Sequence, residues 1–176
     1  MTAPDFPLIG MRCRLRPWRT GDLPSLLRHA NNKDVSRHLR DGFPFPYTEA
    51  DGRSFLQMAG GQAPPTSLAI EVDGSACGGL GLVLRSGNER RTAEIGYWLG
   101  EAYWGRGIGT EALWLMTGYA VDTFALARLE AFAVTTNTRS CRALEKAGYV
   151  LEGRMRRSFL KDGVMHDQCC YGWIAE

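Results

Sequence analysis

Residues 100–110 are Gly100-Glu101-Ala102-Tyr103-Trp104-Gly105-Arg106-Gly107-Ile108-Gly109-Thr110, and this stretch decides how the rest of the chain is interpreted. Its three alternating glycines allow the backbone to turn with positive φ, and they leave no side chain between the N–H groups and an approaching anion. Apolar residues then recur at helical spacing from about Ile108 to Phe124, and the start of such a helix adds unpaired N–H donors and a positive dipole end. The stretch therefore predicts a cradle for a phosphate or diphosphate, with Arg106 as a mobile counter-charge. A plain glycine-rich connection is the alternative.

The segments around this stretch predict a sheet with one parallel pair of strands. Ser67–Val72 and Ala76–Arg85 flank the Asp73-Gly74 dipeptide, which is a strong hairpin signal. Thr92–Leu99 continues this antiparallel meander, and the short apolar run Leu129–Val134 follows the helix. A crossover of this length joins parallel neighbours, so Leu129–Val134 is expected beside Thr92–Leu99 and parallel to it.

The flanking segments extend this sheet. Strand patterns occur in three more segments, namely Met11–Pro17, Tyr149–Leu160 and Val164–Ile174, and the last two are joined by a turn at Asp162 and Gly163. Further helices are expected to begin at Asp22, Thr48 and Asn137, and Gly148 ends the last of them. We expect one domain over residues 1–176, of the mixed α/β (α+β) class, with about seven mostly antiparallel strands and about four helices.

Composition restricts the class of protein. Of the 176 residues, 44% are hydrophobic, and 21 basic against 19 acidic residues leave a net charge of +2. This balance argues against nucleic acid as a partner, and the apolar runs are far shorter than the roughly 20 residues of a membrane span. The amino terminus lacks the pattern of a secretory signal, so a cytoplasmic protein is expected. Five cysteines without a CxxC pair and three scattered histidines predict no metal site.

A dinucleotide site is one alternative use of the glycines. Gly107, Gly109 and Ala112 fit the pattern GxGxxG/A, and Glu130 follows at about the interval of a ribose-binding acid. In dinucleotide folds, however, the glycines directly follow the first strand of a βαβ unit. Here an antiparallel meander comes first, and seven residues separate Leu99 from Gly107. A dinucleotide-binding oxidoreductase is therefore the weaker hypothesis.

Three motifs stand in order along the chain. They are Ala93-Glu94-Ile95-Gly96-Tyr97-Trp98-Leu99, then Tyr103-Trp104-Gly105-Arg106-Gly107-Ile108-Gly109-Thr110-Glu111-Ala112, then Asn137-Thr138-Arg139-Ser140 with Glu145-Lys146-Ala147-Gly148-Tyr149. Together they resemble the GNAT superfamily of acetyl-CoA-dependent N-acetyltransferases, in particular its ribosomal-protein N-terminal (RimJ/RimL-like) branch. The resemblance implies a GNAT-like fold, acetyl-CoA as cosubstrate without a metal, and an acyltransferase acting on a primary amine. It leaves open whether the amine belongs to a protein N-terminus or to a small molecule, and it suggests a homodimer.

The resemblance also implies which residues hold the cofactor. The two parallel strands splay apart, so that backbone groups of Tyr97, Trp98 and Leu99 bind the pantetheine arm as a further strand would. The diphosphate lies on the amides of the glycine-rich turn, which are those of Gly105, Arg106, Gly107, Ile108, Gly109 and Thr110. Asn137 and Ser140 contact the pantetheine and the sulfur.

One position of the second motif differs from the usual pattern of the family, and two cations in the region of the third motif are candidate phosphate ligands. Trp104 stands where many members of the superfamily have Gln or Arg, but an amide cradle survives this change because the backbone does the binding. Arg142 or Lys146 is expected at the adenosine phosphate. A cation near the end of a helix is also simply a good partner for the helix dipole.

Acyl transfer requires a neutral amine. An α-amine with a pKa near 8 costs only about 1.4 kcal/mol to deprotonate at pH 7, so a single carboxylate acting through water suffices. Glu94, on the strand that borders the expected cleft, is the candidate general base. The alternative is an ion pair between Glu94 and Arg90 or Arg91.

The departing thiolate requires a proton. Many relatives have tyrosine at the position of Leu144, and leucine cannot donate, so Ser140 is the candidate donor, with a helix cap as its alternative role. The loop from Phe43 to Tyr47, including Phe45, and Tyr97 are expected to wall the acceptor pocket. The remaining alternative is a non-catalytic CoA-binding sensor, in which Glu94→Gln and Ser140→Ala change nothing.

Overall fold

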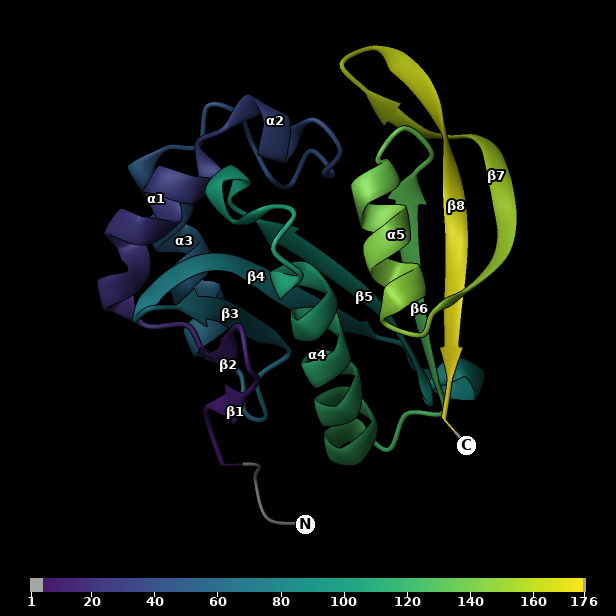
Figure 1. The fold of residues 1–176 in the computed structure, drawn as a ribbon, viewed down its shortest axis with the longest axis horizontal. Helices are drawn as coiled ribbons and strands as arrows, with labels where there is room; N and C mark the ends of the chain where they lie inside the picture. The colour runs from purple at the N-terminus through teal and green to yellow at the C-terminus, as the bar shows by residue number, and fades with distance from the viewer. Residues whose placement is uncertain (1–4, 176) are drawn as a thin grey trace.

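The computed structural model describes residues 5–175, which form one eight-stranded sheet with helices on both faces (Figure 1). The strands are β1 (Leu8–Ile9), β2 (Arg14–Pro17), β3 (Ser67–Val72), β4 (Ser75–Leu84), β5 (Thr92–Leu99), β6 (Arg128–Val134), β7 (Val150–Lys161) and β8 (Val164–Ile174). Their spatial order is β1-β2-β3-β4-β5-β6-β8-β7. Neighbours in this described part are antiparallel except β5 and β6, which confirms the mixed sheet with one parallel pair.

The helices are α1 (Leu23–Ala30), α2 (Lys33–Ser36), α3 (Glu49–Gly60), α4 (Ile108–Phe124) and α5 (Thr138–Lys146). Two short elements, β1 and α2, exceed the expected numbers of strands and helices. A two-residue strand carries no periodicity of its own. The four-residue α2 is held by its cap, because Oδ1 of Asn32 accepts hydrogen bonds from the N–H groups of Asp34 (2.8 Å) and Val35 (3.3 Å).

Near the amino terminus, one expectation was wrong in detail and the helix start at Asp22 was confirmed. The strand expected over Met11–Pro17 begins only at Arg14, because the N–H groups of Met11, Arg12 and Cys13 donate to the carboxylate of Glu111 instead of to a strand. Asp22 precedes α1, but its carboxylate does not cap that helix. It binds the buried guanidinium of Arg16, with both oxygens at 2.8 Å.

The expected turns are confirmed by their dihedral angles. Asp73 (φ 49°) and Gly74 (φ 78°) join β3 to β4, and Asp162 (φ 48°) and Gly163 (φ 78°) join β7 to β8. Both residues of each turn have positive φ, as two-residue hairpins of the Asp-Gly type require. Gly148 ends α5 in the same region (φ 90°), as expected from the sequence.

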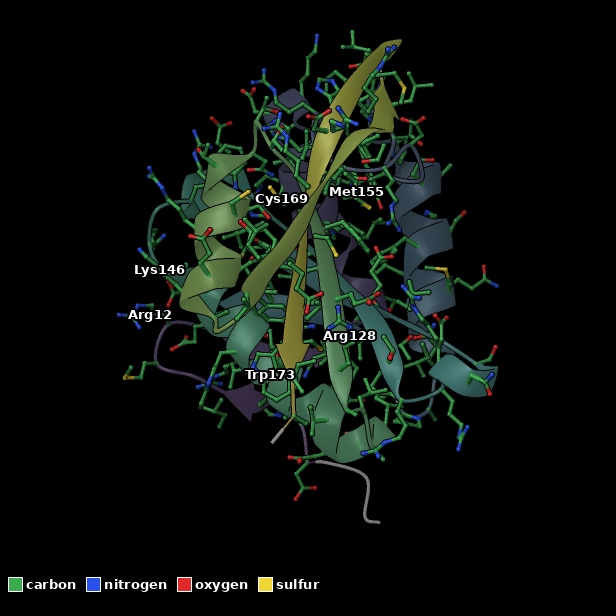
Figure 2. All side chains as sticks on the ribbon, turned by 90° about the vertical axis from the view of Figure 1, so that its right-hand side faces the viewer. Arg12, Arg128, Lys146, Met155, Cys169 and Trp173 are labelled. Atoms are coloured by element: carbon green, nitrogen blue, oxygen red, sulfur yellow. The ribbon has the colours of Figure 1, made fainter. Side chains whose placement is uncertain are left out.

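Two hydrophobic clusters lie on opposite faces of the sheet. The larger contains Leu113 of α4 and Leu144 of α5, and the smaller contains Leu26 of α1 and Leu56 of α3. Figure 2 shows the sheet nearly edge-on, with α5 on one side and α3 on the other. Side chains of β5 alternate between the clusters, so that Tyr97 packs against the first and Trp98 against the second.

The sheet opens between its two central strands. The parallel ladder pairs only Thr92–Glu94 of β5 with Arg128–Glu130 of β6. Beyond Glu94 the strands diverge, and Figure 1 shows β5 and β6 spreading toward the upper edge of the molecule, with α4 and α5 beside the opening. The splayed pair that the resemblance implies is present.

Candidate active site

A cavity of about 870 Å³ lies where β5 and β6 separate, and we call it the central cavity. Residues from four places line it: the end of β5, the turn into α4, the start of α5, and the segment around α2. A volume of this size is in the range of small-molecule and cofactor sites. The elements that diverge in the sheet therefore create an opening large enough for a cofactor.

The glycine-rich turn forms one end of the central cavity. Gly105 (φ 72°) and Gly107 (φ 75°) have left-handed conformations, which glycine adopts at little cost, whereas Gly109 lies inside α4 without positive φ. Among residues 5–175, no protein oxygen accepts from the N–H groups of Gly105 to Thr110, and the N–H of Glu111 is the next to find one, on Gly107 (3.1 Å). The amides of the predicted cradle are therefore open to a ligand.

The backbone of β5 offers further groups beside this turn. The carbonyl of Thr92 accepts from Arg85, next to β4, whereas that of Arg91 accepts from Ala127 and Arg128 on the β6 side. Alternation along the strand therefore directs the backbone groups of Ile95, Tyr97 and Leu99 toward the gap. The carbonyl of Leu99 already accepts from Nε1 of Trp104 (2.7 Å).

Tyr97 and Ser140 meet across the gap. The Tyr97 hydroxyl donates to Oγ of Ser140 at 3.1 Å, and the N–H of Ser140 donates to Oδ1 of Asn137 at 3.2 Å. Ser140 thus has its own hydroxyl proton free to donate, although Asn137 and not Ser140 caps α5. Burial raises the pKa of Tyr97 to about 12, so its hydroxyl stays protonated at neutral pH.

Cationic side chains line one wall of the cavity. Arg139, Arg142 and Lys146 stand at positions i, i+3 and i+7 of α5, which places them on one face of that helix. The guanidinium of Arg139 lies over the Trp104 ring, 4.5 Å from its centroid. Arg106 does not line the cavity, and its guanidinium lies 5.4 Å from the centroid of the Tyr103 ring. Figure 2 shows Arg12 and Lys146 projecting on the same side of the sheet.

Glu94 lies on the face of β5 opposite to Tyr97 and is not among the residues that line the central cavity. Its Oε1 binds Nη2 of Arg40 at 2.6 Å. The ion pair considered from the sequence therefore exists, but its partner comes from the segment after α2, and Arg90 and Arg91 were the wrong partners. The role of Glu94 as a base stays a prediction.

The loop expected to wall the acceptor pocket packs differently. Tyr47 is buried in the second cluster, and its ring lies 5.2 Å from that of Phe43, which in turn lies 5.3 Å from Trp98. Phe45 is about half exposed. Neither Phe45 nor Tyr47 lines the central cavity, so their contact with an acceptor stays a prediction.

Sequence reasoning missed the part of the cavity wall that lies in and just after α2, namely Asp34, Val35, Arg37, His38 and Leu39. The available signal was the Asn32 cap followed by Lys33 and Asp34, which is typical of a helix start. The segment was expected to be a loop. Nothing local indicated that it turns toward the cavity.

Two other features are absent from the described residues. In residues 5–175, no three His, Cys, Asp or Glu side chains are arranged to hold a metal ion. The same residues contain no helix long and apolar enough to span a membrane.

Splayed parallel strands, a glycine-rich turn at a helix start and a capped helix opposite form the arrangement that the resemblance to acetyl-CoA-dependent transferases implies. Residues 12–150 match the family described as acetyltransferase (GNAT) domain, and the chain belongs to this family. The glycine pattern shared with dinucleotide-binding proteins is coincidental, because here it follows an antiparallel meander.

The chain is similar to several known proteins. It is 44% identical over 77 residues to the probable N-acetyltransferase YjcK and 34% identical over 102 residues to the putative ribosomal N-acetyltransferase YdaF, both from Bacillus subtilis. These matches cover 44% and 58% of this chain but only 42% and 55% of the relatives' lengths. The structure of Mycobacterium smegmatis RimJ in complex with CoA-disulfide superposes with a TM-score of 0.79 at 26% identity, covering 93% of this chain and 82% of that one.

Proposed function

We propose that the protein transfers the acetyl group of acetyl-CoA to a primary amine by direct attack in a ternary complex. The observation that carries the proposal is the combination of the open amides at Gly105–Thr110 with the unpaired edge of β5 in one cavity. A diphosphate fits the first, and an amide-containing pantetheine arm fits the second, because it can pair with a strand edge.

The charges of the central cavity support a polyanionic ligand. Arg139, Arg142 and Lys146 supply cations along α5, opposite the start of α4. Phosphate groups bind well to such side chains, and to guanidinium groups in particular. RimJ, whose fold this chain shares, was solved with a CoA-disulfide, which is consistent with CoA as the ligand here.

The chemistry proposed for the sulfur end uses the hydroxyl pair across the gap. The Ser140 hydroxyl protonates the departing thiolate, and the Tyr97 hydroxyl, which already donates to Ser140, replaces that proton. Leu144, buried in the core at the position where many relatives have tyrosine, cannot donate a proton. The base role of Glu94 requires that Arg40 first release the carboxylate, because the guanidinium occupies the oxygen that would accept the proton.

The acceptor belongs to the class of primary amines, either the α-amine of a protein N-terminus or a small-molecule amine. The name of YdaF, a putative ribosomal N-acetyltransferase, favours N-terminal peptides as the first set to assay. The homodimer suggested by the resemblance stays a prediction.

Cofactor binding is tested by thermal shift with acetyl-CoA against NAD. A ligand at 100 times its Kd stabilises the fold by about 2.7 kcal/mol, and we expect this effect with acetyl-CoA and not with NAD. Stabilisation by NAD alone would contradict the proposed cofactor.

Transfer is tested by CoA release with a panel of N-terminal peptides and small amines. We expect Ser140→Ala to lower kcat about 100-fold and Tyr97→Phe about tenfold, with unchanged CoA affinity. Tyr119→Phe is the matched control, since it removes a hydroxyl that donates to Pro65 outside the cavity (2.7 Å), and it should keep full activity. Binding of CoA without transfer to any amine would favour a sensor.

A further inference from the structure

The segment that follows α2 contacts both halves of the sheet. At one side, Nη2 of Arg40 binds Oε1 of Glu94 on β5 (2.6 Å). At the other, Nζ of Lys161, the last residue of β7, donates to Oδ1 of Asp41 (3.0 Å). Figure 1 shows this segment at the upper end of the opening, between α2 and α5. Its two anchors therefore lie on β5, at the last residue of the parallel ladder, and on β7, in the other half of the sheet.

His38 lies in this segment and lines the central cavity together with Tyr97 and Ser140. Its Nε2 is 3.5 Å from Oγ1 of Thr136, the residue before the cap of α5. Ser140 lies in the first turn of that helix. The imidazole therefore lies beside the residues that lead into α5, the helix that carries Ser140.

The surroundings of His38 keep its imidazole neutral. Burial lowers the pKa of His38 below 6.5, and the charges of Arg37 on its own segment, His166 on β8 and Arg139 on α5 lower it further. Asp34 of α2 acts in the opposite direction and is outweighed. A half-buried neutral imidazole at a cavity wall has a lone pair that can accept a proton at pH 7.

We propose that His38 is the catalytic residue that accepts the proton of the acceptor amine, an inference that rests on the proposed function. The amine nitrogen attacks the thioester carbonyl, the C–N bond forms, and the C–S bond breaks. The amine proton passes to the imidazole, while the thiolate takes a proton from Ser140 and Tyr97 supplies Ser140. The imidazolium then releases its proton to water, and the tyrosine oxygen takes one back, so that the enzyme is restored.

Glu94 has a different part in this arrangement. Its carboxylate holds Arg40, two residues beyond His38, and so fixes the segment that carries the imidazole. Glu94 is then a positioning residue that acts through Arg40. If Glu94 is the base, Glu94→Gln changes the pH profile. If His38 is the base, His38→Gln changes it.

The experiment measures CoA release with acetyl-CoA and a synthetic peptide whose first residue is serine, between pH 5 and 8. We expect His38→Gln to lower kcat about 100-fold while the Kd for CoA, measured separately by calorimetry, changes less than twofold. The wild-type kcat should fall at acidic pH, with an apparent pKa below 6.5, because protonation removes the lone pair. His38→Gln should lose this acidic limb.

Three further variants make the result specific. Glu94→Gln should lower kcat yet keep the acidic limb. His29→Gln is the matched control, because burial lowers the pKa of His29 as it does that of His38. His29 packs against Tyr103 (5.3 Å between ring centroids) and does not line the cavity, so this variant should keep the acidic limb. His38→Ala should recover activity when imidazole is added, which a merely structural role would not allow.

Different failures point to different conclusions. If His38→Gln keeps the wild-type kcat or the acidic limb, the inference is wrong. If the limb disappears in Glu94→Gln and persists in His38→Gln, Glu94 is the base. If the wild-type protein binds CoA but transfers acetyl to none of the peptides or amines, the proposed function itself is contradicted.

Discussion

Strand pairing within the first half of the sheet differs from the pairing that joins the two halves. From β2 to β5, each strand pairs with the next along four or more residues, and helices cover both faces. Between β5 and β6 the ladder is only three residue pairs long. Beyond it, side chains alone span the gap, as in the contacts of Tyr97 with Ser140 and of Arg139 with Trp104.

This difference suggests that the first half of the sheet determines stability and that the gap determines ligand binding. The first half contains a buried ion network in which Arg16, 3% exposed, binds both Asp22 and Glu71. The gap contains backbone groups without partners, which a ligand can use. Substitutions in the first half should therefore change the free energy of unfolding, and substitutions along the gap should change affinity and rate.

The largest effect is expected for Asp22→Ala. Removing Asp22 leaves the buried Arg16 guanidinium with Glu71 as its remaining carboxylate partner and should cost about 3 kcal/mol of unfolding free energy, measured by urea denaturation. Glu49→Ala is the matched control, because its pair with Arg53 is exposed and contributes less than about 1 kcal/mol. A loss below 1 kcal/mol for Asp22→Ala would mean that the first half does not depend on this network.

Acid should weaken the same network. Burial raises the pKa of Asp22, but hydrogen bonds from Arg16 and Arg19 outweigh it and hold the pKa below 3.8. A carboxyl whose pKa is lower in the folded state contributes stability above its unfolded pKa and loses it as the pH falls through the folded value. The wild type should therefore lose stability below about pH 4. Asp22→Ala should lose less.

An intermediate effect is expected for Gly107→Val. A β-branched residue in the left-handed conformation of Gly107 (φ 75°) costs about 2 kcal/mol, so the turn should rearrange and the Kd for CoA should rise about 30-fold. Gly118→Ala in α4 is the control, since no atom lies within 4 Å of the added Cβ. It should keep the affinity and add about 0.5–1 kcal/mol of stability. Unchanged affinity in Gly107→Val would argue against the amide cradle.

The smallest effect is expected for the contact between Arg139 and Trp104. Arg139→Ala removes a cation–π contact worth about 0.5–1 kcal/mol and should raise the Kd for CoA about two- to fivefold in calorimetry. Arg139→Lys keeps the charge but not the planar group, and its Kd for CoA should lie between those of the wild type and Arg139→Ala. Equal affinities for all three proteins would show that this side-chain bridge does not contribute to binding.

Local chemistry explains what could be predicted from the sequence. The Asp73-Gly74 turn and the left-handed Gly107 depend on the conformations available to single residues, and both were predicted. The parallel pair followed from the length of the crossover through α4. The GNAT resemblance supplied the assignments to pantetheine and sulfur, which stay predictions.

What could not be predicted depends on pairings distant in sequence. Arg40 and Glu94 are brought together by the fold, and Thr136 lies 98 residues from His38, so neither contact has a local signature. For the same reason the sequence suggested nearby arginines for Glu94. Tyr47 resembled a pocket residue because it is aromatic and lies in a loop, yet its ring is buried against Phe43.

The indole of Trp104 has one more consequence. It donates to the carbonyl of Leu99, so that the carbonyl of Tyr97 is the next one along β5 that faces the gap. A pantetheine arm that pairs with this strand edge would therefore compete with the indole at Leu99, and this competition would set the register of the pairing. Trp104, which replaces the usual Gln or Arg, would in this way determine how far the thioester end of the cofactor reaches toward α5.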